Sequence, residues 1–505
     1  MNSRNKKLIR VIAIILAVLL AGGVVFGALF SALSEEAQPP QERSRVELTM
    51  EYLNDEQALR ITQRLIYFNA TGKRLEGVVF YAAGNMFRRQ SALMYESDDL
   101  DAVFPNGYAP AGIDLRSVKC DGKPTDFGFQ GEDELYLRAA CDLGPGETCA
   151  FEFDYYLLLM RCNAFQGIGD TDVRLSAFCF VPGVFDGATG EFALKKPLPY
   201  TRWLYCDSAD YVADLWLPRG YLCAGTGGIQ SVESEGERTL WHVEATDVRD
   251  FALSFGRRWR VTAGESASGV AVRVLTNVRG AGQRALERAV ATIDRCEAWF
   301  GDFPVRRLDI VQSDYPLGAL SFPGAIWVPG AWMEGGGADA LDHALRFGAA
   351  QQYFGLSAYV EPSADAWLSD SLCEYAACLL LEDERGSEEF LNAVNRDWVS
   401  ALQQTVPGGL NVTSDAALFD GYSYDIVVLK RGAVVLHELR LAMGLEGLLD
   451  GLAAFYRMGG EKGTLTEMDF VAALDAATGS DWEDFLTDWV FNVDKYTEQT
   501  MFWYE

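Results

Sequence analysis

The sequence predicts an α+β protein with an N-terminal transmembrane helix, a β-rich domain, and a mixed domain that ends in a helical tail. Three observations lead to this prediction. An uncharged apolar run lies near the start, short strand-like runs fill the first half, and long helical patterns fill the second half. With 505 residues, 49% of them apolar, the chain is long enough for two or three folded domains.

The apolar run covers residues 11–33 and follows a basic segment at residues 1–10. As a helix it would be about 35 Å long, which exceeds the roughly 30 Å core of a bilayer. The run is longer than the apolar part of a cleaved signal peptide, and no small-x-small cleavage site ends it. Because basic flanks stay inside, we expect a cytoplasmic tail at 1–10, a single-pass signal anchor at 11–33 and an ectodomain outside the cell.

A polar, proline-containing linker at 34–45 separates the anchor from a region of strand-like runs at 46–261. Residues 59–84 alternate apolar and polar side chains and break at NATGK (69–73), which predicts two strands joined by a turn. Similar runs cover 148–159, 173–182 and 251–261. We therefore expect a large antiparallel β domain over 46–261, followed by a second linker, TAGESASG, at 262–269.

Residues 270–505 combine both patterns. Strands are expected at 270–276 and 306–313, with an edge-strand region at 317–330 and a helix at 282–301 that ends at a glycine. Helical periodicity then dominates around 339–354, 364–383, 386–404, 425–443, 445–457, 466–477 and 481–491. This part of the chain is predicted to be a mixed domain with a helical C-terminal tail.

Charge and cysteine content exclude several classes of function. The formal net charge of −29 argues against nucleic-acid binding, which needs clustered Lys and Arg. The ten cysteines form no CxxC motif, so neither a zinc ribbon nor a thioredoxin-type site is encoded. The six cysteines nearest the N-terminus are candidates for disulfides outside the membrane, but their pairing cannot be read from the sequence.

Several segments, in the same order along the chain, resemble the gluzincin family of membrane alanyl aminopeptidases. YFNATGKRLEGVVFYAAGNMF (67–87) and VRDFALSF (248–255) are similar to segments of that family's first domain. LGALSFPG (317–324) is similar to its GAMEN loop, QYFG (352–355) to the end of its zinc helix, and WLSDSLCEY (367–375) to its WLNEGFAxY helix. LKRGAVVLHELR (429–440) and DFLTDWV (484–490) are similar to its later helices. The resemblance implies a saddle-like β domain before a thermolysin-like, aminopeptidase-type domain.

The zinc-binding residues that the resemblance implies are replaced in this chain. A catalytic zinc needs about three protein ligands, and an HExxH helix supplies two histidines and a general-base glutamate. Phe347 and Gln351 occupy the two histidine positions, and Gly348 occupies the glutamate position. Phe cannot bind a metal, and an amide is a poor zinc ligand. Asp370 at the third ligand position is still a carboxylate, but it is the single conservative change among these four positions, so we expect no zinc cofactor.

Two further catalytic positions also differ. Ser321 stands where the family's glutamate grips the substrate amine, and Leu429 stands where its tyrosine stabilises the oxyanion. Removal of one oxyanion donor costs roughly 100- to 1000-fold in rate. The weak alternative ligand is His343, one helical turn before Phe347, which could act together with Asp370. The positions of a candidate peptide-binding cleft are Gly318, Ala319, Ser321, Asp370 and Glu374.

Three functions remain open at this point. The first is a membrane-anchored, catalytically inactive aminopeptidase-like ectodomain that binds a peptide or protein partner outside the cell. The second is an active zinc metallopeptidase with atypical ligands. The third is a structural or assembly subunit beside a membrane complex, and it predicts a cleft that large side chains fill.

Overall fold

The computed structural model describes residues 43–90, 93, 95–196, 198 and 204–491. The expected cytoplasmic tail, the anchor at 11–33 and most of the linker at 34–45 lie outside these ranges. Within them, no helix combines the length and the apolar character needed to cross a membrane. The β-rich region, the mixed region and the C-terminal helices lie inside the described ranges.

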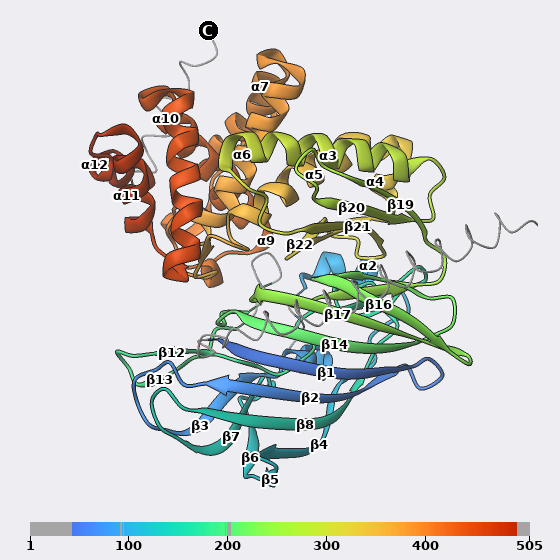
Figure 1. Cartoon of the computed structure of the whole chain (residues 1–505). Coiled ribbons are helices and arrows are strands. Elements are labelled where there is room, and N and C mark those ends of the chain that lie inside the picture. Colours follow the sequence, from blue (N-terminus) through green and yellow to red (C-terminus); the bar gives the residue numbers. More distant parts are fainter. Residues whose placement is uncertain (1–42, 91–92, 94, 197, 199–203, 492–505) are drawn as a thin grey trace, which may run out of the picture. The chain divides into compact units, whose positions relative to one another are not determined.

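The first half is built around an eight-stranded sheet, whose central strands run side by side in Figure 1. Its spatial order is β16 (Gly228–Glu235), β17 (Arg238–Val248), β14 (Ala209–Pro218), β1 (Ser44–Leu53), β2 (Ala58–Phe68), β8 (Thr148–Leu158), β4 (Gly112–Cys120) and β5 (Lys123–Pro124). Neighbouring strands are antiparallel except β1 and β14, which pair in parallel. The sequence predicted an antiparallel domain, and this prediction is wrong for the pair β1 and β14. A parallel pair needs a long connection, and here the intervening strands supply it.

Two four-stranded sheets complete the β-rich region. One has the order β15 (Leu222–Gly225), β18 (Leu253–Gly256), β10 (Val173–Leu175) and β9 (Gly167–Ile168). The other has the order β11 (Val181–Pro182), β3 (Leu75–Tyr81), β7 (Tyr136–Leu143) and β6 (Phe127–Gln130). The smaller elements are β12 (Val184–Asp186), β13 (Glu191–Ala193), η1 (Ala83–Phe87), η3 (Ser97–Asp99) and α2 (Leu100–Val103).

The alternation that predicted these strands has a direct structural reason. Along β8, Cys149, Phe151, Phe153, Tyr155 and Leu157 are buried, and the residues between them are more exposed. The two strands expected within 59–84 are β2 and β3, but they lie in different sheets. The turn between them is held by Asn69, whose amide donates to the Gly144 carbonyl at 2.9 Å. The chain therefore passes between the two layers at this turn.

A five-stranded sheet begins the second half, in the order β19 (Arg260–Glu265), β20 (Ala271–Thr276), β21 (Arg307–Ser313), β23 (Ala325–Pro329) and β22 (Leu320–Phe322). The prediction of a linker at 262–269 is wrong for residues 262–265, which belong to β19 and pair with β20. Pairing in the sheet outweighs the small and polar composition of this segment. Helix α3 (Ala281–Phe300) packs against β19 and β20.

The remaining elements are mostly helical, as expected. They are α4 (Gly330–Met333), η4 (Gly335–Gly337), α5 (Ala338–Tyr353), α6 (Trp367–Arg385), α7 (Ser387–Ala393), η5 (Val394–Val399), α8 (Ser400–Leu402), η6 (Pro407–Gly409), η7 (Ala416–Leu418), α9 (Gly421–Tyr424), η8 (Asp425–Arg431), α10 (Gly432–Lys462), α11 (Glu467–Thr478) and α12 (Glu483–Phe491), with the short strands β24 (Tyr359–Val360) and β25 (Thr464–Leu465). Within α10, Gly444 has a φ of 83°. It breaks the helix where the sequence predicted two helices.

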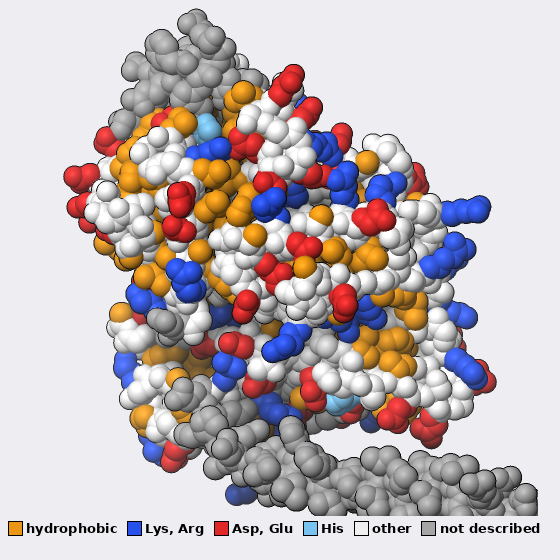
Figure 2. All heavy atoms as spheres, turned by 45° about the horizontal axis from the view of Figure 1, so that its top comes forward, with side chains coloured by type: hydrophobic (Ala, Val, Ile, Leu, Met, Phe, Trp, Pro, Cys, Tyr) orange, Lys and Arg blue, Asp and Glu red, His pale blue; other side chains and the backbone are white. Residues whose placement is uncertain are grey.

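The two halves share a packed boundary. Val311, Phe322 and Trp327 of the five-stranded sheet belong to the core of the β-rich region, whereas α5, α6 and α10 pack into a second core. On the face seen in Figure 2, acidic and basic side chains are interspersed. In contrast to this face, the cavity where the two halves meet is lined by more acidic than basic side chains.

Candidate functional site

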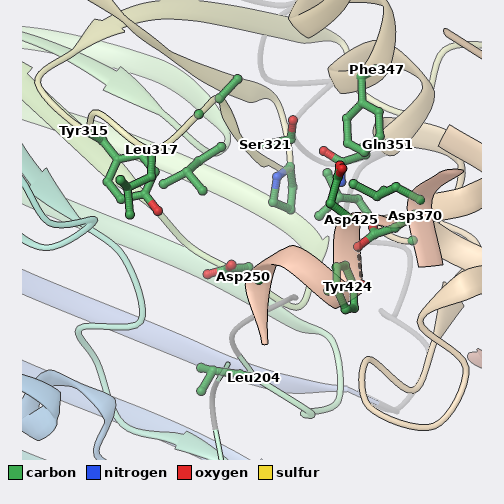
Figure 3. A pocket seen from close by; sticks show the side chains of 18 of the residues that line it. Leu204, Asp250, Tyr315, Leu317, Ser321, Phe347, Gln351, Asp370, Tyr424 and Asp425 are labelled. Carbon is green, nitrogen blue, oxygen red and sulfur yellow. Dashed lines mark hydrogen bonds between the residues drawn. The ribbon is translucent and has the colours of Figure 1, made fainter. Parts of the chain in front are cut away.

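A cavity of about 400 Å³ lies where the β-rich region meets the five-stranded sheet and the helices (Figure 3). Its lining includes Tyr95, Glu96, Asp99, Leu204, Arg249, Asp250, Tyr315, Leu317, Gly318, Ala319, Leu320, Ser321, Pro323, Phe347, Gln351, Gly355, Leu356, Tyr359, Asp370, Gly421, Tyr424, Asp425 and Leu429. Such a size suits a small molecule or a short stretch of peptide.

The structure brings most of the candidate residues together in this cavity. Phe347 and Gln351 lie one turn apart on α5, and Asp370 lies near the start of α6. Leu429 of η8 and the loop that carries Gly318, Ala319 and Ser321 complete the group. Gly348, His343 and Glu374 are not part of the lining.

Gly348 is buried because α5 packs closely against the sheet at this point. A Cβ atom at position 348 would lie 2.6 Å from Ile326 Cδ1 and 3.0 Å from Ser321 Oγ. Ile326 is itself fully buried on β23. A glutamate side chain at position 348 would therefore displace the core.

The neighbouring Gln352 fixes this close approach. Its side chain accepts a hydrogen bond from the Gly324 amide at 2.9 Å and donates to the Phe322 carbonyl at 3.1 Å. Phe322 ends β22 and Gly324 lies in the turn to β23, and Gln352 is 1% exposed. A buried and satisfied amide of this kind holds α5 against the edge of the sheet.

Asp370 already has hydrogen-bond donors within the protein. The Tyr424 hydroxyl donates to Asp370 Oδ2 at 2.7 Å, and the Ser369 hydroxyl donates to Oδ1 at 3.2 Å. Tyr424 ends α9, a short helix that Asp420 and Ser423 cap reciprocally. Tyr424 was not among the residues predicted from the sequence, because the DGYSYD pattern around it indicates only the N-terminal cap of a helix.

A charged cluster ties three helical elements together beside the cavity. His343 Nε2 on α5 lies 3.0 Å from Glu374 Oε2 on α6, and Lys430 Nζ on η8 lies 2.8 Å from Glu374 Oε1. Burial alone would raise the pKa of Glu374, but Lys430 and His343 hold it well below its usual range. Glu374 is therefore ionised and neutralised by partners.

The cavity lining is rich in carboxylates that the sequence analysis mostly missed. Five acidic side chains line it: Glu96, Asp99, Asp250, Asp370 and Asp425. Burial raises the pKa of Asp425, an effect that Lys430 partly offsets. Burial raises the pKa of Asp99 too, helped by Glu96 and Asp98. The lining has one basic side chain, Arg249, whose guanidinium lies 4.2 Å from the Tyr359 ring centre.

The charged pair Arg249 and Asp250 was visible in the sequence as the polar start of the apolar run FALSF. It carried no assigned role there. The acidic residues Glu96 and Asp99 come from the segment before α2. They reach the cavity only because the β-rich region packs on the helices. The periodicity of apolar residues in the sequence cannot predict this packing.

A buried ion pair in the β-rich region supports the loop that forms one wall. Arg174, which is fully buried, pairs with Asp172, and Asp172 Oδ1 accepts from the Asp314 amide at 3.3 Å. The Asp314 carboxylate in turn accepts from the Thr171 amide at 2.6 Å. Burial raises the pKa of Asp172 to about 6, although Arg174 opposes this shift. The network holds the loop that begins at Asp314 and continues to Tyr315 and Leu317 in the lining.

Comparison with known proteins identifies the fold. No known family profile and no curated protein sequence matches the chain. Among solved structures, an M1 zinc metallopeptidase from Deinococcus radiodurans is similar, with a TM-score of 0.63 and 15% identity over 90% of this chain and 95% of that chain. A point variant of that enzyme bound to a Tyr-Ser-Ala substrate has a TM-score of 0.61 and 16% identity, over 89% and 95%.

A two-domain M1 zinc metallopeptidase variant bound to L-arginine is also similar. It has a TM-score of 0.62 and 16% identity, over 89% of this chain and 95% of that chain. At such low identity, likeness in structure speaks for the fold and not for the activity. The chain has the fold of the M1 zinc metallopeptidases, with a sheet-rich first region and a helical C-terminal region.

Proposed function

We propose that this chain is a membrane-anchored, non-catalytic M1-type protein whose ectodomain binds a peptide or protein partner outside the cell. The observation that carries the proposal is the packing of Gly348, where Ile326 and Ser321 occupy the space that a general-base glutamate would need. The basic segment 1–10 and the apolar run 11–33 support the anchor and its orientation.

The residues at the ligand positions do not fit a zinc ion. Phe347 offers no donor atom, and Gln351 offers only an amide. Asp370 Oδ2 is engaged by the Tyr424 hydroxyl, and His343 is engaged by Glu374. We therefore propose that the ectodomain folds and binds its partner without zinc.

The cavity supports a partner that carries positive charge. Five carboxylates and one guanidinium line it, so a cationic side chain or a free amino terminus gains Coulomb energy there. One structural neighbour is a variant bound to L-arginine, a cationic amino acid. In the described chain, β22 pairs only with β23, and its residues Leu320 and Ser321 face the cavity. An extended peptide can pair with such a strand edge.

The test combines metal analysis with peptide binding. The full-length chain, purified in mild detergent without chelator, is exchanged into metal-free buffer and titrated calorimetrically with Arg-Ala-Ala and Glu-Ala-Ala. We expect zinc well below one per chain and binding of the basic peptide in preference to the acidic one. Peptide cleavage is followed by mass spectrometry in the same samples.

Other outcomes would overturn the proposal. Near-stoichiometric zinc with chelator-sensitive cleavage would establish a metallopeptidase with atypical ligands. Absence of binding by either peptide, in a folded and metal-free protein, would favour a structural subunit beside a membrane complex. The open cavity counts against the function as a structural subunit, because that function predicts a cleft filled by large side chains.

A further inference from the structure

Among the described residues that line the cavity, Arg249 is the one basic side chain, beside five carboxylates. It stands in the loop between β17, which ends at Val248, and β18, which begins at Leu253. The next residue along the chain, Asp250, is one of the five acidic residues. The proposed function uses the carboxylates of this lining and assigns no role to Arg249.

The Arg249 side chain is held in place by Tyr359 of β24. The centre of the guanidinium lies 4.2 Å from the centre of the Tyr359 ring, which is the geometry of a cation–π contact. Tyr359 is 2% exposed, and its hydroxyl donates to the Leu204 carbonyl at 3.0 Å. On another side, a Cβ atom added to Gly463 would lie 3.9 Å from a terminal nitrogen of Arg249. The guanidinium therefore lies beside β24 and the turn that precedes β25.

The wall that carries Arg249 is separate from the part of the cavity formed by α5. In Figure 3, Leu204 lies at the bottom of the view, and Phe347 and Gln351 of α5 lie at the top. Arg249 lies on the side of Leu204, because both residues contact Tyr359. A short extended peptide that reaches across the cavity can therefore contact Arg249 at one end and the region of α5 at the other.

The guanidinium of Arg249 has no ion-pair partner within the described part of the chain. Its Nε atom is buried without a hydrogen-bond partner, and none of the ion pairs between described residues includes Arg249. Arg249 opposes the increase in pKa that burial causes at Asp207, but the two groups form no ion pair. Stacking uses the face of a guanidinium and leaves the N–H donors at its edge available. A carboxylate suits these donors, because it can accept two parallel hydrogen bonds.

We propose that Arg249 binds a carboxylate of the peptide that occupies the cavity, and that this ligand is a short peptide with both a positive charge and a carboxylate. The inference rests on the proposed function, because it names a second group by which the same cavity recognises its peptide. The carboxylate is either the C terminus of the peptide or an acidic side chain, since both offer the same pair of oxygens. Positive charge alone is then not enough for tight binding.

The test compares three peptides by calorimetry, with the full-length chain in mild detergent at pH 7. They are Arg-Ala-Ala, the C-terminal amide of Arg-Ala-Ala and the C-terminal amide of Arg-Ala-Glu. The first carries a terminal carboxylate, the second carries none and the third carries a side-chain carboxylate. We expect the wild type to bind at least one of the two carboxylate-bearing peptides about tenfold more tightly than the Arg-Ala-Ala amide. The peptide that gains affinity identifies the source of the carboxylate.

Arg249→Gln should remove this preference, so that the affinities for the three peptides agree within about twofold. The affinity for the Arg-Ala-Ala amide should not fall in this variant, because the substitution removes a positive charge from the cavity. Arg249→Lys keeps the charge but loses the planar fork of donors, so it should retain part of the preference. Melting temperatures close to that of the wild type show that the variants are folded.

The matched control is Arg257→Gln. Arg257 also stacks on a tyrosine, with its guanidinium 5.5 Å from the centre of the Tyr221 ring, but it lies outside the cavity lining. This variant should keep the preference of the wild type for the carboxylate.

Three outcomes would contradict the inference in different ways. Equal affinity of the wild type for all three peptides would overturn it and leave the proposed function standing. A preference that persists in Arg249→Gln would also overturn it, because another group would then bind the carboxylate. Absence of binding by all three peptides would overturn the proposed function and the inference with it.

Discussion

Two adjacent stretches of α5 differ sharply in chemistry. At the cavity end, Phe347, Gly348 and Gln351 offer no charged group. One turn earlier, His343 reaches Glu374, which Lys430 also holds. The two stretches are in contact, because the His343 and Phe347 rings stack with their centres 6.0 Å apart.

The difference shows which contacts hold α5 to α6 and η8. In this chain, a buried ionic cluster joins α5, α6 and η8, and apolar packing fills the adjacent positions. Phe347 and Gln351 line the cavity, whereas the charged cluster lies outside the lining.

Gly348→Glu tests the packed stretch and should have the largest effect. The new side chain would meet Ile326 at the first carbon and would bury a carboxylate in the core. We expect a loss of about 4 kcal/mol or more in the free energy of unfolding, measured by urea denaturation.

The matched control for that variant is Gly460→Glu. Gly460 also lies in a helix, α10, but it is exposed and has open space around its Cβ direction. This variant should be as stable as the wild type or slightly more stable, since glycine is a poor helix former. Wild-type stability in Gly348→Glu would show that the family's general-base position is open.

Glu374→Gln tests the charged stretch. It removes the charge of the carboxylate that Lys430 contacts at 2.8 Å and leaves that buried ammonium group with the more distant Asp425, so we expect a loss of about 3 kcal/mol at pH 7. The folded-state pKa of Glu374 is lowered, so its contribution is present above the unfolded-state pKa and is lost as the pH falls below that value. The stability difference between wild type and variant should therefore shrink between pH 5 and pH 3.

Asp397→Asn is the control for the charged cluster, because Asp397 pairs with Arg396, a side chain that is 74% exposed. Its cost should stay below about 1 kcal/mol. Equal losses in the two variants would mean that the buried cluster does not hold the helices together. A difference that stays constant with pH would contradict the ionised state of Glu374.

Tyr424→Phe tests the wall of the cavity at which the Tyr424 hydroxyl donates a hydrogen bond to Asp370. Loss of the 2.7 Å hydrogen bond to a carboxylate should cost about 1.5 to 3 kcal/mol of stability. The adjacent Tyr422→Phe is the control, since Tyr422 is 59% exposed and its hydroxyl donates to Gln404. Similar stability in both variants would show that Asp370 does not need this donor.

Asp425→Asn tests the acidic lining itself and should have the smallest effect. We expect affinity for Arg-Ala-Ala to fall by about threefold to tenfold, with stability nearly unchanged. Because burial raises the pKa of Asp425, wild-type affinity should increase as the pH rises through its titration, and the variant should lose that increase. Calorimetry over pH 4 to 7 measures both.

Asp450→Asn is the control for the acidic lining, because it removes one negative charge from α10 outside the cavity. It should leave the affinity within about twofold at physiological salt. If Asp425→Asn and Asp450→Asn weaken binding equally, the peptide is attracted by the net negative charge of the protein and not by the acidic side chains of the cavity.

Some parts of the site could be predicted from the sequence because they depend on local spacing. Phe347 and Gln351 lie one turn apart on a helix, so their common face follows from helical periodicity. The order of the gluzincin-like segments likewise predicted that Ser321, Asp370 and Leu429 would meet, and all three line the cavity. Glu374 shows the limit of this reasoning, since it was a candidate residue of the cleft but does not line the cavity. Its two ionic partners instead come from α5 and η8.

The sheet-rich first region and the helical C-terminal region could be predicted from the sequence, because alternation and helical periodicity act over a few residues. The replaced residues on α5 followed from the resemblance to the gluzincin motifs. Only the tertiary structure decided the parallel pairing of β1 with β14 and the strand at 260–265 in place of a linker. It also decided the close packing of Gly348, the Tyr424–Asp370 contact and the gathering of acidic side chains in one cavity. These features join residues that are far apart in the chain, and their stability depends on burial and Coulomb interactions that no local pattern reports.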